Sequence, residues 1–102
     1  MKLNLLERIM ILNILPKEAN FTTLKIMNKL KESVAPSEEE YKEFEIKQSE
    51  SGITWNLKGN EEVEIPIGEK ATDVIVESLK ELDKNKKLTQ ELFGLYEKFI
   101  EG

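Results

Sequence analysis

The sequence contains neither cysteine nor histidine. The lack of cysteine excludes disulfide bonds and thiol nucleophiles, and the two absences together exclude zinc sites built from these residues. Without histidine the chain also lacks the usual proton carrier near neutral pH, so many enzyme classes are excluded. Because cysteine usage is what reveals a redox compartment, the sequence offers no evidence on that point.

Arginine is also scarce. Arg8 is the only arginine among fifteen basic residues, and twenty acidic residues leave a formal net charge of −5. The arginine fork is the preferred protein group for phosphate and base recognition, and an acidic surface repels nucleic acid at long range. The composition therefore disfavours nucleic-acid binding.

No apolar run is long enough to span a bilayer. The N-terminal apolar stretch is interrupted by Glu7 and Arg8, and no small-residue cleavage site follows before Pro16. We therefore expect a cytoplasmic protein with no membrane association.

A length of 102 residues, with 39% hydrophobic and 34% charged residues, predicts one ordered domain over 1–102.

The densest apolar stretch lies near the N-terminus, where nine of thirteen positions are large and apolar. They are Leu3, Leu5, Leu6, Ile9, Met10, Ile11, Leu12, Ile14 and Leu15. At about 100° per residue these side chains surround a helix instead of lining one face, and such a helix must be buried. Two explanations stay open: other elements of the same chain cover this helix, or a second copy covers part of it.

Capping signals and apolar spacing predict two helices in the first third of the chain. Asn4 with Glu7 is a capping pair for the first helix, which ends at Pro16. If Thr22 is the cap of the second helix, Phe21 has the spacing of a hydrophobic staple with Ile26. The second helix is amphipathic, because its lysines fall on the side opposite its apolar residues.

A third, short helix is predicted at Ser37-Glu38-Glu39-Glu40, where a capping box is combined with acidic residues that complement the helix dipole. From Glu43 to Ile67 the apolar period changes to two, which predicts three short strands in an antiparallel meander. In this alternation Trp55 shares an inward face with Ile53 and Leu57.

Two helices complete the pattern. Gly68 opens the first, and the second follows a Thr89 cap. The last helix has a wide apolar face, since Phe93 and Leu95 lie off the line of its other apolar residues. The sequence thus predicts an α+β fold with three N-terminal helices, a three-stranded antiparallel meander and two C-terminal helices. Surplus apolar surface near both ends favours self-association into a homo-oligomer.

No arrangement of residues points to catalysis. The acidic clusters lack the spacing of a metal loop and the glycines are isolated, so we predict no metal site, no cofactor and no enzyme. In a small-ligand binder, lysines would meet phosphate and aromatic rings would stack on a base. The residues we predict for such contacts are Lys25, Lys29, Tyr41 and Trp55. For Trp55, packing in the core is the competing interpretation.

The order of three helices and a strand pair is also that of a winged-helix DNA-binding domain. Residues 38–44 would then form the recognition helix, which carries four glutamates against Lys42 alone. Because such a helix repels phosphate, charge favours an acidic connector at this position.

Three stretches carry a resemblance: Leu3-Asn4-Leu5-Leu6-Glu7-Arg8 through Glu18, Ile67-Gly68-Glu69-Lys70-Ala71-Thr72-Asp73, and Leu88-Thr89 through Phe99. Together they are similar to small uncharacterised accessory proteins encoded in bacteriophage and prophage genomes. The resemblance implies a protein that binds and blocks a host protein, sequesters a small signalling molecule, or assists particle assembly.

We therefore predict a non-catalytic accessory protein that binds a host or phage protein, as a homo-oligomer. Two alternatives stay open. One is a protein that binds or sequesters a nucleotide or another small phosphorylated ligand in pockets between subunits. The other is a winged-helix DNA-binding regulator.

Overall fold

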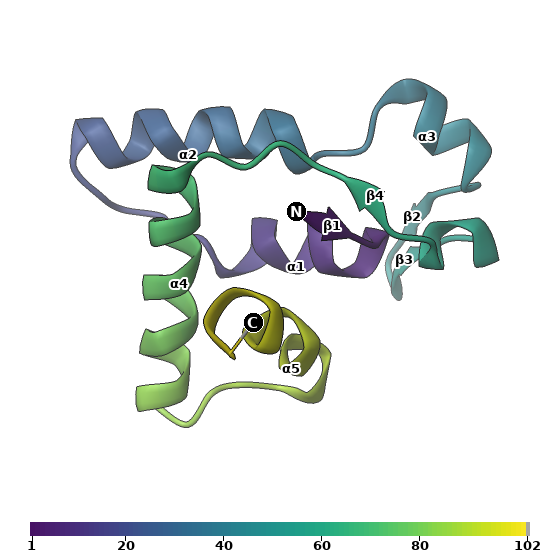
Figure 1. Ribbon diagram of the computed structural model, residues 1–102. Helices are drawn as coiled ribbons and strands as arrows, with labels where there is room; N and C mark the ends of the chain where they lie inside the picture. The colour runs from purple at the N-terminus through teal and green to yellow at the C-terminus, as the bar shows by residue number, and fades with distance from the viewer. Residues whose placement is uncertain (102) are drawn as a thin grey trace.

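The computed structural model describes residues 1–101 (Figure 1). Its elements are β1 (Lys2–Leu3), α1 (Leu5–Ile14), α2 (Phe21–Val34), α3 (Glu38–Glu43), β2 (Lys47–Ser49), β3 (Gly52–Thr54), the 3₁₀ helix η1 (Leu57–Asn60), β4 (Val63–Glu64), α4 (Glu69–Lys84), α5 (Gln90–Tyr96) and the π-helix η2 (Glu97–Glu101). The predicted α+β class is confirmed, with three helices before the hairpin and two long helical segments after it.

Local capping signals fix the starts of two helices. Asn4 and Ser37 are the N-caps of α1 and α3, and each accepts a hydrogen bond from the backbone N–H three residues later. The glutamates at those third positions, Glu7 and Glu40, accept from the backbone N–H of the cap. Both predicted capping boxes are thereby confirmed, since they depend only on residues within one turn.

The second helix starts earlier than the staple interpretation requires. Asn20 is its N-cap and accepts from the backbone N–H of Thr23. Phe21 is therefore the first residue of α2 instead of the residue before the cap, and its side chain is 77% exposed. The predicted staple with Ile26 is wrong, because a staple requires Phe21 to precede the N-cap. Phe21 instead lies inside the helix, where side chains point toward the N-terminus and away from the next turn.

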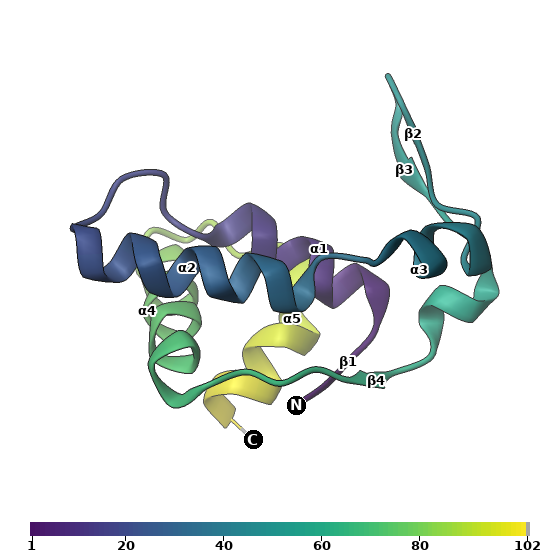
Figure 2. The ribbon, with the colours of Figure 1, turned by 90° about the horizontal axis from the view of Figure 1, so that it is seen from above.

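Helix α1 lies at the centre of the fold, with α2, α4 and α5 of the same chain packed against it (Figures 1 and 2). Leu5 and Ile11 are buried, and the other apolar side chains of this helix are half-buried. The chain's own helices thus cover α1 in part, and cover by a second copy stays a prediction.

The main core joins residues from both halves of the chain around α1. Its buried members are Leu3, Ile11, Leu15, Met27, Leu30, Val34, Ile65, Ala71, Ile75, Leu79, Leu92 and Leu95. Helix α4 contributes a regular stripe to this core, as its predicted helical spacing requires.

The strands pair in two small antiparallel sheets instead of one three-stranded meander. β2 and β3 form a hairpin, in which Ser49 lies opposite Gly52. β4 pairs with β1 near the N-terminus, where Leu3 lies opposite Val63. Gly52 has a φ of +127°, a conformation that favours glycine and allows the tight turn. The hairpin projects from the body of the protein, and the side chains of both strands are exposed (Figure 2).

The alternation predicted around Trp55 ends at η1. Ile53 and Leu57 are 37% and 83% exposed, so the expected inward face is wrong, and Trp55 itself is half-buried. Asn56 caps η1 by accepting from the backbone N–H of Lys58, which turns the chain away from the hairpin. η1 lies where the end of the second strand and the turn after it were predicted, and the third predicted strand, β4, pairs with β1 instead of β3.

Gly59 of η1 lies directly against the Trp55 ring, since an added Cβ would come within 2.5 Å of Cδ1. We expect Gly59→Ala to displace this sole tryptophan and to lower the free energy of unfolding by about 1–3 kcal/mol, as overpacking does. Gly94→Ala is the matched control: its nearest neighbour would be Glu7 Oε2 at 3.9 Å, and removing a helical glycine stabilises by about 0.5–1 kcal/mol. Urea unfolding and tryptophan fluorescence measure both. An unchanged emission spectrum in Gly59→Ala would contradict the packing.

Candidate docking groove

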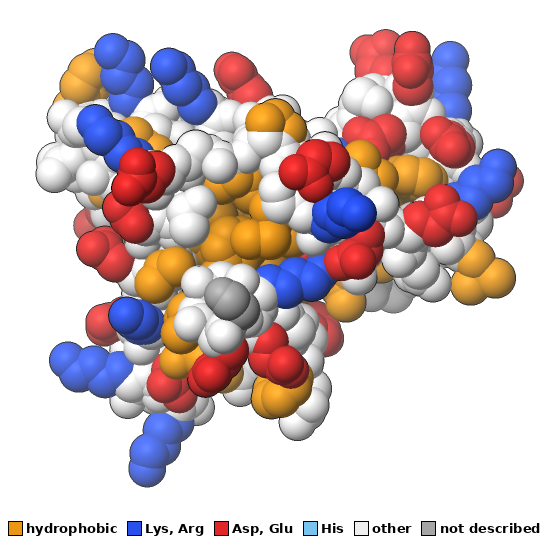
Figure 3. Space-filling view, viewed as in Figure 1, with side chains coloured by type: hydrophobic (Ala, Val, Ile, Leu, Met, Phe, Trp, Pro, Cys, Tyr) orange, Lys and Arg blue, Asp and Glu red, His pale blue; other side chains and the backbone are white. Residues whose placement is uncertain are grey.

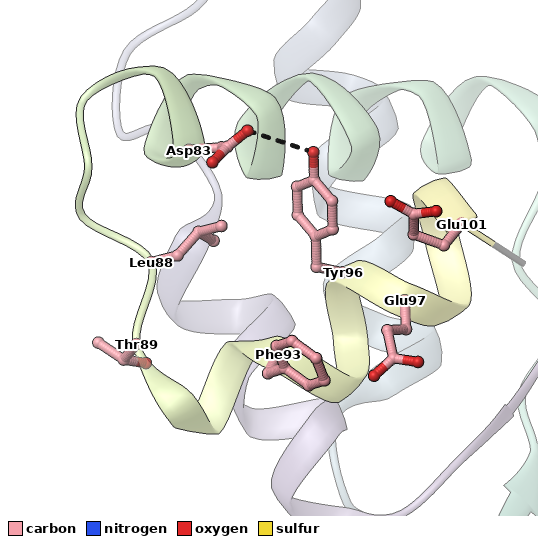
Figure 4. Close-up of a pocket in the computed structure, with 7 residues that line it drawn as sticks. All are labelled: Asp83, Leu88, Thr89, Phe93, Tyr96, Glu97 and Glu101. Atoms are coloured by element: carbon pink, nitrogen blue, oxygen red, sulfur yellow. Dashed lines mark hydrogen bonds between the residues drawn. The ribbon is translucent and has the colours of Figure 1, made fainter.

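A groove of about 530 Å³ lies between the end of α4 and the α5–η2 segment (Figure 4). We call it the C-terminal groove. Its lining residues are Asp83, Leu88, Thr89, Phe93, Tyr96, Glu97 and Glu101. Every charged group in this lining is acidic, and its apolar side chains include the two aromatic residues Phe93 and Tyr96. Such a surface suits a partner group that is both apolar and basic.

The π-helix η2 follows Tyr96 and forms one wall of the groove. Its Glu97 and Glu101 are both in the lining, which Figure 4 draws. Residues four apart also share a face in an α-helix, so this placement does not depend on the π-helical turn.

Tyr96 joins the two walls. Its hydroxyl donates to Asp83 Oδ2 across 3.4 Å, linking α5 to the end of α4 (Figure 4). Partial burial and the negative charges of Asp83 and Glu101 raise the pKa of this hydroxyl above its ordinary value. The phenol is thus protonated at neutral pH and presents a ring with a polar edge to the groove.

Phe93 is the most exposed side chain of the lining that is wholly apolar. It is 61% exposed, whereas Leu92 and Leu95 on the same helix are buried in the core. The surplus apolar surface predicted for this helix is therefore confirmed at Phe93. At Leu95 the prediction is wrong, because Leu95 is buried in the core and α5 packs against α1. A single exposed phenylalanine is common on proteins, but one set in a groove with carboxylates around it has the form of a binding site.

Lys98 holds the α5–η2 segment to the N-terminal part of the chain. Its Nζ lies 2.7 Å from Glu7 Oε1, 3.1 Å from the carbonyl oxygen of Lys2, and also contacts Glu62. Burial lowers the pKa of Lys98, but the hydrogen bonds to Glu62 and Glu7 outweigh it, so its pKa is raised overall. The same contact lowers the pKa of Glu62. The groove is therefore built on an anchored helix.

The four residues predicted to contact a small ligand do not meet in one pocket of a single copy. Lys25 and Lys29 are exposed on α2, while Tyr41 and Trp55 belong to the segment of α3, the hairpin and η1. The first half of α2 and this segment lie at opposite ends of the protein (Figure 2). Nucleotide binding between subunits stays a prediction.

The segment compared with a DNA recognition helix is short and fixed to the body. α3 spans six residues, and its Glu40 is bound to Arg8 of α1. Glu38, Glu39 and Glu43 are exposed, so the face offered to solvent is acidic. This acidic face repels phosphate, and DNA binding stays a prediction.

Among residues 1–101, no three acidic side chains are grouped so that they could hold a metal ion. Within the same range, none of the helices has both the length and the hydropathy needed to cross a bilayer. Comparisons with known protein families, with curated proteins and with solved structures find no match for this chain.

Proposed function

We propose that this chain is a non-catalytic protein-binding module and that the C-terminal groove is its docking surface. The observation that carries the proposal is Phe93, which is 61% exposed in a lining whose charged residues are all acidic. Phe93 and Leu88 offer apolar area to an anchoring side chain, and the carboxylates favour a basic rim on the partner.

The mechanism is occupation of a partner's surface. Apolar anchors buried at the centre of an interface supply most of the affinity, and charges around them select the partner and its orientation. In keeping with the resemblance to phage accessory proteins, we propose that the partner is a host or phage protein or another copy of the chain. We place this activity in the cytoplasm.

Photo-cross-linking from inside the groove tests the proposal. A photoreactive phenylalanine analogue replaces Phe93 in cells that express the chain naturally, and the same analogue replaces Tyr41 as the control. Tyr41 is 50% exposed, but it lies on α3, away from the groove. We expect a discrete protein adduct from position 93 that position 41 does not give.

Charge reversal sharpens this experiment. Glu97→Lys changes a residue of the lining and should reduce the adduct, whereas Glu91→Lys on α5 changes an exposed residue outside the lining and should leave it. Docking through the groove is excluded if position 93 gives no adduct, or gives the same adducts as position 41.

A further inference from the structure

The protein has a second exposed phenylalanine, and the charged residues that follow it on its helix are basic instead of acidic. Phe21 begins α2 and is 77% exposed. Lys25 and Lys29 follow at intervals of four, so the three side chains lie along one side of the helix. All three are exposed, and we call them the α2 face. Figure 3 shows blue side chains gathered beside an orange one over the N-terminal half of α2.

Helix α2 is the only net basic α-helix within residues 1–101. It carries Lys25, Lys29 and Lys31 against Glu32, whereas α3, α4 and the α5–η2 segment each carry more acidic than basic residues. In a chain of net charge −5, a basic helix with an exposed aromatic residue at its start is a distinct surface.

The α2 face and the C-terminal groove are complementary. One presents Phe21 beside lysines, and the other presents Phe93 and Tyr96 among carboxylates. The groove volume of about 530 Å³ lies within the range of pockets that enclose small organic molecules, so it has room for the Phe21 ring. Pairing two grooves with each other would instead bring like charges together.

We propose that copies of this chain assemble head to tail, with the α2 face of one copy docked in the C-terminal groove of the next. This inference rests on the proposed docking function and names the occupant of the groove as a second copy. The contact is heterologous because it joins two different surfaces, so it closes into a ring or extends as a filament. Lys25 and Lys29, predicted as ligand contacts, acquire a role at the subunit interface.

Two double variants separate the two halves of the contact. Phe21→Ala/Lys25→Glu removes the α2 face and keeps the groove, and Phe93→Ala/Glu97→Lys removes the groove and keeps the α2 face. All four side chains are exposed, so the core is untouched, and circular dichroism checks the fold of each variant. Loss of an interface anchor of this kind weakens association by about thirtyfold or more.

Light scattering coupled to size-exclusion chromatography gives the readout at high micromolar concentration. We expect wild type to be larger than a dimer, and each double variant alone to be a monomer. A mixture of the two should stop at a dimer, because one intact contact remains between them. Tyr41→Ala, which removes another exposed aromatic side chain, should behave as wild type.

Each other result overturns the head-to-tail assembly in a recognisable way. A monomeric wild type excludes self-docking, and an oligomer in either double variant alone shows that another surface joins the copies. If the wild type is monomeric while position 93 still cross-links to a different protein, the docking function holds and a second copy is not its occupant.

Discussion

Replacing Arg8 with methionine should lower the free energy of unfolding by about 3–5 kcal/mol, as removing one partner of a buried ion pair does. The Arg8 side chain is 2% exposed, and its two terminal nitrogens contact both carboxylate oxygens of Glu40 at 2.6 and 2.9 Å. Its Nε and Nη2 also donate to the carbonyl oxygens of Val34 and Ala35. These carbonyls end α2, where helices leave acceptors without an intrahelical partner.

Two controls separate charge from geometry. Arg8→Lys keeps the positive charge but not the planar fork, so it should lose a smaller part of the stability. Lys80→Met changes an exposed basic residue of α4 outside both proposed docking surfaces and should stay within about 0.5 kcal/mol of wild type. Urea unfolding followed by circular dichroism at neutral pH measures all three. A loss below about 1 kcal/mol in Arg8→Met would show that Arg8 does not hold α1, α2 and α3 together.

Acid should remove a smaller part of the stability through Glu40, the other residue of this ion pair. The hydrogen bonds from Arg8 lower the pKa of Glu40 from 4.5 to about 2. Because the folded-state pKa lies below the unfolded one, the contribution is complete above pH 4.5 and is lost as pH falls toward 2. A shift of this size corresponds to about 3 kcal/mol at most, and solvent screening at the partly exposed Glu40 reduces the contribution to about 1–2 kcal/mol.

Glu40→Gln isolates this contribution from the titration of other carboxylates. Between pH 4.5 and about 2, wild type should lose about 1–2 kcal/mol more than the variant, which has no carboxyl group at this position. Glu39→Gln is the matched control, since Glu39 lies on the same helix and forms no ion pair within residues 1–101. If wild type and Glu40→Gln lose stability in parallel across this range, Arg8 does not perturb the carboxyl group.

Helix starts could be predicted because their causes lie within one turn. The caps at Asn4 and Ser37 need only a glutamate three residues on, which the sequence displays. The second function of each glutamate could not be predicted in this way. Glu40 binds Arg8 from 32 residues away, and Glu7 binds Lys98 from 91 residues away, so both contacts depend on the completed fold.

The predicted strand pairing was wrong for a related reason. Apolar alternation indicates where a strand lies but not which strand it meets, and β1 is only two residues long. The cap of η1 by Asn56 redirected the chain and left Leu57 exposed where the alternation placed it inside. Local hydrogen bonding by a side chain thus outweighed the periodic pattern.

The candidate site could be predicted from the sequence only in part. Phe93 lies off the apolar line of its helix, which pointed to an unburied side chain in the sequence. The acidic lining gave no such signal, because Asp83 comes from α4 while Glu97 and Glu101 come from a π-helical turn. Two separate elements, α4 and η2, had to be placed before this charge pattern emerged.

The central position of α1 has a consequence for synthesis on the ribosome. This helix is made first, yet α5, which covers one side of it, begins only at Gln90. At translation rates of about 5–20 residues per second, the delay is roughly 4 to 15 seconds. During that time the side of α1 that α5 covers in the finished fold has no permanent cover. The yield of this protein in cells should therefore depend on chaperones that shield nascent chains, even where the finished fold is stable.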